Sequence, residues 1–306
     1  MRVELSLIQK TFENQIQKSI SSIHKMENVP NNHVFKIEAE SESYIFKIYS
    51  KRNWPEDGKV PFIYRKLDEF HISHAQLFVF DREDENFPNG YLIEQCLPGT
   101  TADRLALSKD DTVLLFEKLA ALVSRVHQIS MINYGYTGGG APAGWTTFSE
   151  FLYDVLTDNS DSLIANGFME TEELQNVNKA IHEKLKHYDV FPSVLCHGDL
   201  SEKNILVDTN EITLIDWDDA QSLPWVADIT RLTFWMEIHY NEQMAATCKK
   251  AFLDCYETVY DKKIYYEMED ALHVWYGLDN LTFFTEGAVC DKVKKLLQDS
   301  RNKCGI

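Results

Sequence analysis

Two segments in the second half of the chain decide the fold: VLCHGDLSEKNILVD at residues 194–208 and LIDW at residues 214–217. The first segment has the spacing H-x-D-x-x-x-x-N, and its three fixed residues are His197, Asp199 and Asn204. This spacing brings a carboxylate and an amide into one short loop. The same spacing occurs in loops that transfer phosphoryl groups, which makes Asp199 the first candidate for a catalytic residue.

A β-hairpin is predicted directly after this loop. The apolar runs 205–207 and 212–215 flank a polar turn, which is typical of two paired strands. The pairing would place Asn204 and Asp216 roughly opposite each other at the open end, where opposed residues have Cβ atoms ~5 Å apart. An amide oxygen and a carboxylate suit Mg²⁺, together with water and nucleotide phosphates. We therefore predict that Asn204 and Asp216 bind magnesium and that Asp199 faces the metal.

Phosphoryl transfer also needs a lysine on the nucleotide phosphates and an aspartate that orients the accepting hydroxyl. Asp199 is predicted to orient the hydroxyl. Lys47 lies in the middle of YIFKIY at residues 44–49, a strand-like run. Phe46 and Ile48 would point to one face of that strand and into the core, so Lys47 would point the other way, towards the nucleotide. The predicted reaction moves the γ-phosphoryl group of ATP or GTP to a hydroxyl.

The first part of the chain is predicted to form a small sheet. Apolar residues at helical spacing precede it and predict a helix over residues 5–20. The runs 34–37 and 44–49 then predict a hairpin with a longish turn. Two further strands are predicted at 77–80 and 91–93.

The pattern becomes helical after Pro98-Gly99. Residues 108–111 and 147–150 each match a capping box, in which side chains satisfy the free amides of a helix start. The fold class is therefore α+β. We expect a nucleotide-binding lobe of small antiparallel sheet at 1–95, and a larger, mainly helical catalytic and substrate-binding lobe at 96–306.

The motif from His197 to Trp217 resembles the aminoglycoside phosphotransferase and choline kinase family. Further segments that share the resemblance are 91–99, 125–129, 134–145 and 227–229. The resemblance thus covers most of residues 30–235. It implies a protein-kinase-like, two-lobed fold and a magnesium-dependent small-molecule kinase as the activity.

The resemblance also implies roles for residues that spacing alone does not assign. Backbone groups near Glu94 and Cys96 would hydrogen-bond the adenine or guanine. His197 would brace the catalytic loop without taking part in the chemistry, and Asp228 would steady that loop. Asn32 would contact the nucleotide from the turn that covers it, residues 28–33.

The chain departs from the family pattern at two places. The turn at 28–33 has no glycine. The first helix after the lysine strand should carry a glutamate, but here it offers Arg65 and Lys66. The possible acidic partners of Lys47 are then Glu56, Asp57, Asp68 and Glu69, and the sequence does not choose between them.

The chain is strongly acidic, with 48 acidic and 30 basic residues and a net charge of −18. The net charge is −3 over residues 1–95 and −15 over 96–306. Nucleic acids and anionic membranes are therefore disfavoured as partners. The charge favours a cationic acceptor, such as an aminoglycoside or an amino-alcohol, with Asp218, Asp219 and Glu237 as candidate contacts.

Other features of the sequence bear on where the protein is located and on its possible function. No run reaches the ~18–20 apolar residues of a membrane span, and no signal-peptide pattern is present, so we expect a cytoplasmic protein. The six cysteines form no CxxC pair. Two alternatives to a kinase stay open: a catalytically inactive nucleotide-binding module, and a metal-dependent hydrolase. The oligomeric state, the acceptor and the choice between ATP and GTP are also open.

Overall fold

The computed structural model describes residues 4–27, 31–209 and 211–306. They form two compact units. The first unit comprises residues 1–102, 137–141 and 205–219, and the second comprises residues 103–136, 142–204 and 220–306. These bounds differ from the expected lobes because residues 137–141 and 205–219 pack with the N-terminal part. Residues 28–30, half of the predicted covering turn at 28–33, lie outside the described residues.

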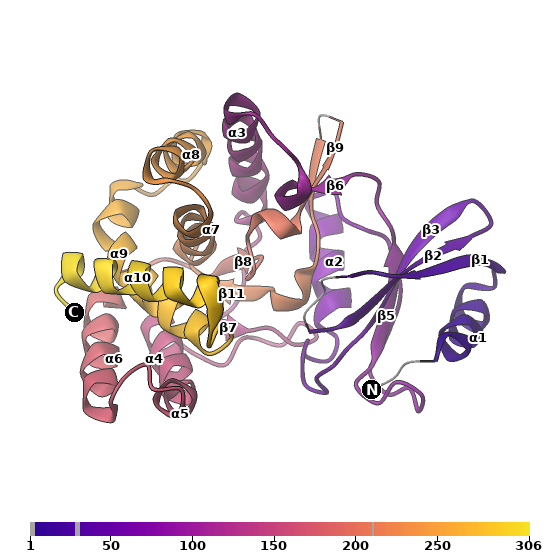
Figure 1. Cartoon of the computed structure of the whole chain (residues 1–306), viewed down its shortest axis with the longest axis horizontal. Helices are drawn as coiled ribbons and strands as arrows, with labels where there is room; N and C mark the ends of the chain where they lie inside the picture. The colour runs from indigo at the N-terminus through magenta and orange to yellow at the C-terminus, as the bar shows by residue number, and fades with distance from the viewer. Residues whose placement is uncertain (1–3, 28–30, 210) are drawn as a thin grey trace. The chain divides into compact units, whose positions relative to one another are not determined.

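A five-stranded antiparallel sheet forms the frame of the first unit, with the strand order β1-β2-β3-β5-β4 (Figure 1). Its strands are β1 (Ile20–Lys25), β2 (His33–Ala39), β3 (Glu42–Ile48), β4 (Leu77–Asp81) and β5 (Tyr91–Gln95). Helix α1 (Leu5–Ile16) packs Ile8 and Phe12 against Phe35, Phe46 and neighbouring apolar residues of the sheet. The predicted antiparallel sheet is therefore confirmed.

The predicted opening helix is four residues too long. Gln17 takes a left-handed conformation with φ 60°, and its amide caps the helix on the carbonyl of Glu13. The helix ends there because an L-residue is unfavourable in the left-handed region of a continuing helix. Ile20, which fits the helical spacing, therefore begins β1.

The turn of the β2–β3 hairpin is shorter than predicted. Ala39 pairs with Glu42, so only Glu40 and Ser41 form the loop. Both have positive φ, 48° and 70°, as a two-residue hairpin turn requires. The polar run at 38–43 gives no sign of this, because most of it is strand.

The remaining elements of the first unit position the candidate site. Helix α2 (Lys59–Glu69) precedes β4. The hairpin predicted after the catalytic motif is confirmed as β9 (Ile205–Asp208) and β10 (Glu211–Leu214), whose last pair is Ile205 with Leu214. The short strand β6 (Thr100–Thr101) extends this hairpin into a three-stranded sheet.

The second unit is mainly helical, as expected. Its α-helices are α3 (Lys109–Val126), α4 (Phe148–Asp158), α5 (Ser160–Ala165), α6 (Thr171–Leu185), α7 (Val226–His239), α8 (Glu242–Cys255), α9 (Lys263–Leu281) and α10 (Gly287–Cys304). A small sheet of β7 (Gly135–Tyr136), β11 (Gln221–Leu223) and β8 (Val194–Cys196) lies among them. Both predicted caps form, since Ser108 and Thr147 accept hydrogen bonds from the amides of Asp111 and Glu150.

Apolar side chains of α7 and α9 form much of the core of the second unit. Phe234, Leu272 and Leu278 are fully buried, and Trp275 is nearly so. None of the helices in the described part of the chain has an apolar stretch long enough to cross a membrane.

Candidate active site

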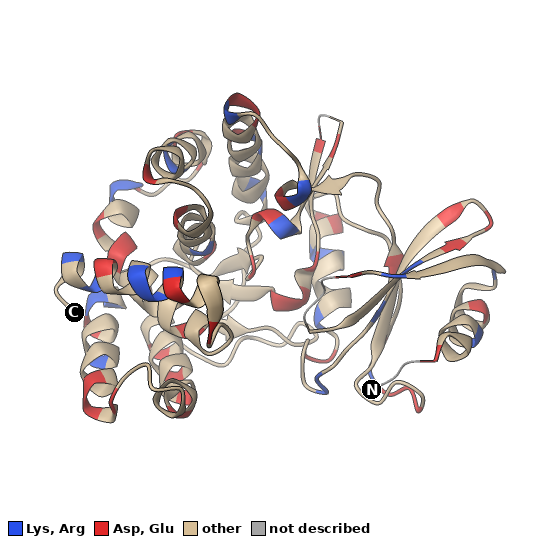
Figure 2. Ribbon diagram, viewed as in Figure 1, with Lys and Arg blue, Asp and Glu red and all other residues tan. Residues whose placement is uncertain are grey.

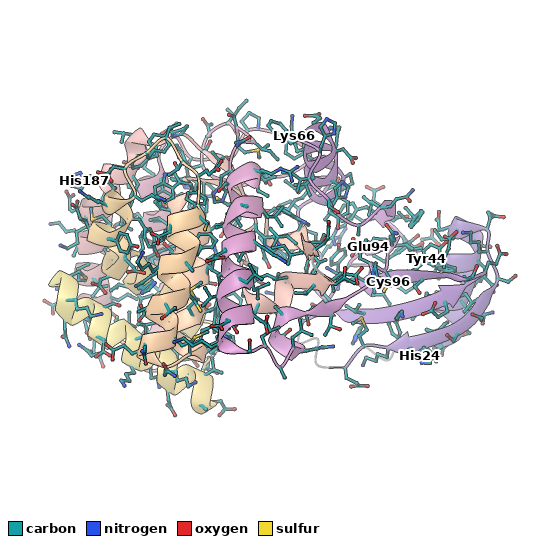
Figure 3. All side chains as sticks on the ribbon, turned by 90° about the horizontal axis from the view of Figure 1, so that it is seen from above. His24, Tyr44, Lys66, Glu94, Cys96 and His187 are labelled. Carbon is teal, nitrogen blue, oxygen red and sulfur yellow. The ribbon has the colours of Figure 1, made fainter. Side chains whose placement is uncertain are left out.

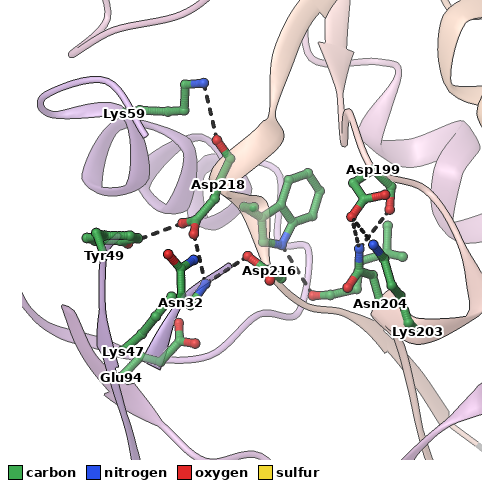
Figure 4. A network of polar contacts seen from close by, with 12 residues as sticks. Asn32, Lys47, Tyr49, Lys59, Glu94, Asp199, Lys203, Asn204, Asp216 and Asp218 are labelled. Carbon is green, nitrogen blue, oxygen red and sulfur yellow. Dashed lines mark hydrogen bonds and ion pairs between the residues drawn. The ribbon is translucent and has the colours of Figure 1, made fainter. Parts of the chain in front are cut away.

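Lys47 is the second-last residue of β3 and lies on the face of the sheet opposite the core. Its neighbours Phe46 and Ile48 belong to the core cluster, as the strand alternation predicts. The Lys47 ammonium forms ion pairs with Asp216 at 2.8 Å and with Asp218 at 2.9 Å (Figure 4). Burial alone would lower the pKa of Lys47, but the two carboxylates outweigh it and raise the pKa above its ordinary value. The lysine therefore stays charged.

The four acids considered as partners of Lys47 do not pair with it among the described residues. Lys47 instead contacts the two aspartates that follow the β9–β10 hairpin. Glu56 pairs with Lys59, the first residue of α2. The sequence offers no local sign of this arrangement, because Lys47 and Asp218 are 171 residues apart.

Asp216 and Asp218 differ sharply in exposure although one residue separates them. The Asp216 side chain is 47% exposed, and its backbone is left-handed with φ 63°. The Asp218 side chain is only 7% exposed, and it also accepts a hydrogen bond from the Tyr49 hydroxyl at 3.2 Å. Asp219 is partly buried. Asp216 is thus accessible to a cation from solvent, whereas protein groups enclose Asp218.

Glu94 lies on β5 and is 9% exposed. The Tyr64 hydroxyl, from α2, donates a hydrogen bond to its carboxyl group at 2.5 Å. Burial raises the pKa of Glu94 to about 7, although Lys47 and Tyr64 act in the opposite direction. Glu94 is therefore a buried acid that titrates near neutral pH.

The other two predicted nucleotide contacts are Cys96, which lies close to Glu94 (Figure 3), and Asn32. The backbone amide of Cys96 donates to the carbonyl of Ser43 at 2.9 Å, so it is engaged in the sheet. Burial raises the pKa of the Cys96 thiol. Asn32 accepts a hydrogen bond from the amide of Ser50 at 3.2 Å.

In the second unit, the H-x-D-x-x-x-x-N motif forms a loop in which Asp199 contacts two neighbours (Figure 4). The Asn204 side-chain amide donates to the Asp199 carboxylate at 2.9 Å and to its carbonyl at 2.8 Å. Lys203 pairs with the same carboxylate oxygen, Oδ2, at 2.8 Å. Sequence reasoning overlooked Lys203, although a base only four residues after Asp199 in the same motif is a sign of such a pair.

The backbone of this loop is tied to Asp228, at the start of α7. The amides of His197 and Gly198 donate to the Asp228 carboxylate at 2.6 and 3.0 Å, and His127 contacts it at 3.2 Å. Burial alone would raise the pKa of Asp228, but these hydrogen bonds and nearby positive charge hold it below its ordinary value. Gly198 has φ 85°, which a side chain would disfavour.

His197 and Glu237 complete the set of predicted site residues. His197 is fully buried, and its Nδ1 accepts the amide of Asp199 at 3.3 Å. Glu237, on α7, is 30% exposed at its side chain and lies 3.5 Å from Lys249. Lys249 pairs more closely with Glu269 at 2.8 Å. A lysine therefore offsets part of the negative charge around Glu237.

Comparison with known proteins identifies relatives of this chain. Residues 30–261 match the model of the phosphotransferase enzyme family. No curated protein sequence matches the chain.

Several solved structures have a similar fold. A thermostable mutant of aminoglycoside phosphotransferase APH(4)-Ia, in complex with AMP-PNP and hygromycin B, has a TM-score of 0.68 at 16% identity, covering 97% of this chain and 96% of that one. A putative fructosamine-3-kinase from Thermobifida fusca has a TM-score of 0.67 at 14% identity, with 98% and 100% covered. The choline kinase LicA from Streptococcus pneumoniae has a TM-score of 0.64 at 15% identity, with 98% of both chains covered. At these identities, the likeness establishes the fold, and it confirms the predicted protein-kinase-like architecture.

Proposed function

The chain belongs to the phosphotransferase enzyme family, and we propose that it is a kinase that phosphorylates a hydroxyl group of a small molecule. The co-substrate is ATP or GTP, and the reaction requires Mg²⁺. The observation that carries this proposal is the ion pair between the buried Lys47 and the half-exposed Asp216 at 2.8 Å. This ion pair joins the lysine of the strand to the aspartate that follows the hairpin. Phosphoryl transfer requires these two residues at the same nucleotide phosphates.

The proposed metal ligands have the right donor chemistry for magnesium. Asp216 offers a half-exposed carboxylate. Asn204 uses its side-chain nitrogen as a donor to Asp199, which orients its oxygen as an acceptor. Both are hard oxygen ligands of the type Mg²⁺ prefers. The bound ion would neutralise phosphate charge.

In the proposed mechanism, Asp199 orients the acceptor hydroxyl and receives its proton. One carboxylate oxygen is held by Asn204 and Lys203, which fixes the orientation of the group. The hydroxyl oxygen forms a new bond to the γ-phosphorus while the bond to the β-phosphate oxygen breaks. Lys47 holds the phosphates of the nucleotide. Because the reaction needs positioning and charge neutralisation, these contacts supply the main contributions.

The nucleotide base is assigned to the segment that contains Glu94 and Cys96, with Asn32 as a further contact. Since the Cys96 amide already donates to Ser43, we assign the carbonyl groups of this segment and the amides beyond Cys96 to the base. His197 and Asp228 serve as supports of the catalytic loop. Their buried contacts with the loop backbone favour this role.

We further propose that the acceptor carries positive charge. The net charge of −18 favours cations over anions near the protein. Proteins of similar fold include the aminoglycoside phosphotransferase complex with hygromycin B and the choline kinase. An aminoglycoside-like compound or an amino-alcohol is the leading class.

A phosphorylation screen tests the proposal. The purified protein is incubated with Mg-ATP or Mg-GTP and a panel of aminoglycosides, amino-alcohols and neutral sugars, and release of nucleoside diphosphate is measured. We expect release that depends on one acceptor class and is lost in Asp216→Ala. Release that is independent of any acceptor would indicate a hydrolase. Nucleotide binding without any release would indicate an inactive binding module.

A further inference from the structure

Lys47 is a buried cation that needs a lasting counter-ion. The residue is only 5% exposed, so its charge is largely shielded from water. An uncompensated buried charge is strongly destabilising. Two carboxylates are present, and their surroundings differ enough to assign them different roles.

Asp216 alone is poorly suited to neutralise the charge of Lys47. Its side chain is 47% exposed, and the proposed function gives this carboxylate to magnesium. A carboxylate that binds a divalent ion neutralises less of the charge of a nearby ammonium. Lys47 therefore needs a second acid that keeps its contact when the metal binds.

Asp218 meets this requirement. One of its carboxylate oxygens contacts the Lys47 ammonium at 2.9 Å, and the other accepts the Tyr49 hydroxyl at 3.2 Å. With 7% of its side chain exposed, it has little access to solvent ions. Both carboxylate oxygens of Asp218 are thus engaged, one by Lys47 of β3 and the other by Tyr49, the residue directly after β3.

The backbone of Asp218 is held as well. Lys59, the first residue of α2, is fully buried and donates to the Asp218 carbonyl at 3.2 Å. Its ammonium also pairs with Glu56 and lies 4.1 Å from the ring centre of Trp54. Helix α2 is therefore connected to the Asp218 loop through a lysine. The two acids of α2 are engaged elsewhere, since Asp68 pairs with His74 and Glu69 pairs with Lys66.

We propose that Asp218 is the positioning residue for Lys47, and that Lys59 fixes the loop that carries Asp218. Asp218 holds the ammonium in place for the nucleotide phosphates while Asp216 binds the metal. The inference rests on the proposed kinase function. It assigns to the loop after β10 the task that a helix glutamate would otherwise perform.

A double-mutant cycle tests this inference. Asp218→Asn removes the charge while keeping the shape and the hydrogen-bond acceptor for Tyr49, and Lys47→Met removes the ammonium. We expect Asp218→Asn to lower kcat/KM for Mg-nucleotide at least tenfold. In the Lys47→Met background, the same change should cost less than threefold. The matched control is Asp208→Asn on β9, an exposed aspartate, which should leave kcat/KM unchanged.

A milder variant covers the case in which Asp218→Asn does not fold. Tyr49→Phe removes only the hydrogen bond to Asp218 and should raise KM for the nucleotide about threefold, with no further effect in Lys47→Met. Circular dichroism checks that each variant is folded at the assay temperature.

The outcomes separate the inference from the proposed function. Two outcomes in a wild type that transfers phosphoryl groups would show that the inference alone is wrong. In the first, Asp218→Asn retains wild-type kcat/KM. In the second, the losses of kcat/KM from Asp218→Asn and Lys47→Met multiply in the double mutant. If the wild type binds nucleotide without transfer, the same cycle is read from dissociation constants by calorimetry. A wild type that neither binds nucleotide nor transfers phosphoryl groups would overturn both.

Discussion

Neighbouring side chains fix the orientation of the Asp199 carboxylate. Asn204 and Lys203 both contact its Oδ2, while the amide of Asp199 itself donates to His197. The side chain is still 23% exposed, so it is accessible to a substrate. A group with this combination of fixed orientation and access suits proton transfer at a hydroxyl.

We predict that Asp199→Asn lowers kcat by ~10²-fold or more, because positioned acid–base groups contribute ~10²–10⁴-fold. Nucleotide affinity and the unfolding midpoint should stay close to those of the wild type. Steady-state kinetics, calorimetry and thermal unfolding measure these quantities. A kcat within tenfold of the wild type, equivalent to only ~1.4 kcal/mol in the barrier, would refute the role of Asp199.

Glu94 makes the stability of the protein depend on pH. Its pKa is about 7 in the folded protein, against 4.5 for an ordinary glutamate. The folded state therefore holds this proton at pH values where the unfolded state has lost it. The stabilisation is complete below about pH 4.5, and it is lost as the pH rises through about 7.

We predict that Glu94→Gln removes this pH dependence. The variant should be more stable than the wild type above pH 7, by about 1–3 kcal/mol, since the neutral amide avoids a buried charge. Urea unfolding at pH 5 and pH 8 measures the difference. The control is Glu211→Gln at an exposed position of β10, which should follow the wild type at both pH values. An equal stability difference between Glu94→Gln and the wild type at both pH values would contradict the assignment.

At the scale of elements, the turn of the β2–β3 hairpin has a backbone conformation that is unfavourable for most residues. Ser41 lies in its two-residue turn with φ 70°, and its side chain is exposed. L-residues pay ~1–2 kcal/mol for the left-handed conformation. Glycine avoids this cost but loses more backbone entropy on folding, by ~0.5–1 kcal/mol.

We therefore predict that Ser41→Gly raises the free energy of unfolding by about 0.5 kcal/mol. Ser41→Ala is the matched control, because it removes the hydroxyl without relieving the backbone conformation. Urea unfolding compares the two variants. If Ser41→Gly is less stable than Ser41→Ala, the turn does not carry the left-handed strain described here.

The elements that the sequence predicts are those with a clear period or a capping pattern. The alternation at residues 44–49 identifies β3 and the direction of Lys47, and Ser108 identifies the start of α3. Strands of two or three residues, such as β6 and β7, have no measurable period. The partner of Lys47 lies far along the chain, and local patterns carry no information on such contacts.

At the scale of the whole molecule, the net charge is divided more evenly between the two units than the values for residues 1–95 and 96–306 suggest. Residues 205–219 contain five acids and no base, and they belong to the first unit. The first unit therefore carries −8 of the total charge of −18, and the second unit carries −10. Figure 2 shows acidic residues on elements of both units. A cation is attracted by either unit, without any need for a separate acidic lobe.

This charge predicts how a cationic acceptor responds to salt. Its KM should rise as ionic strength increases from ~0.01 to ~0.15 M, because the Debye length falls from ~30 to ~8 Å and long-range attraction is screened. Some local acids are offset, since Glu237 and Glu269 share Lys249, so the distributed charge should dominate the response. The measurement is KM for the best acceptor of the screen over this salt range, with KM for a neutral sugar as the control. If the best acceptor is neutral or anionic, or if its KM does not change with salt, the acidic residues serve solvation and the proposal of a cationic acceptor is wrong.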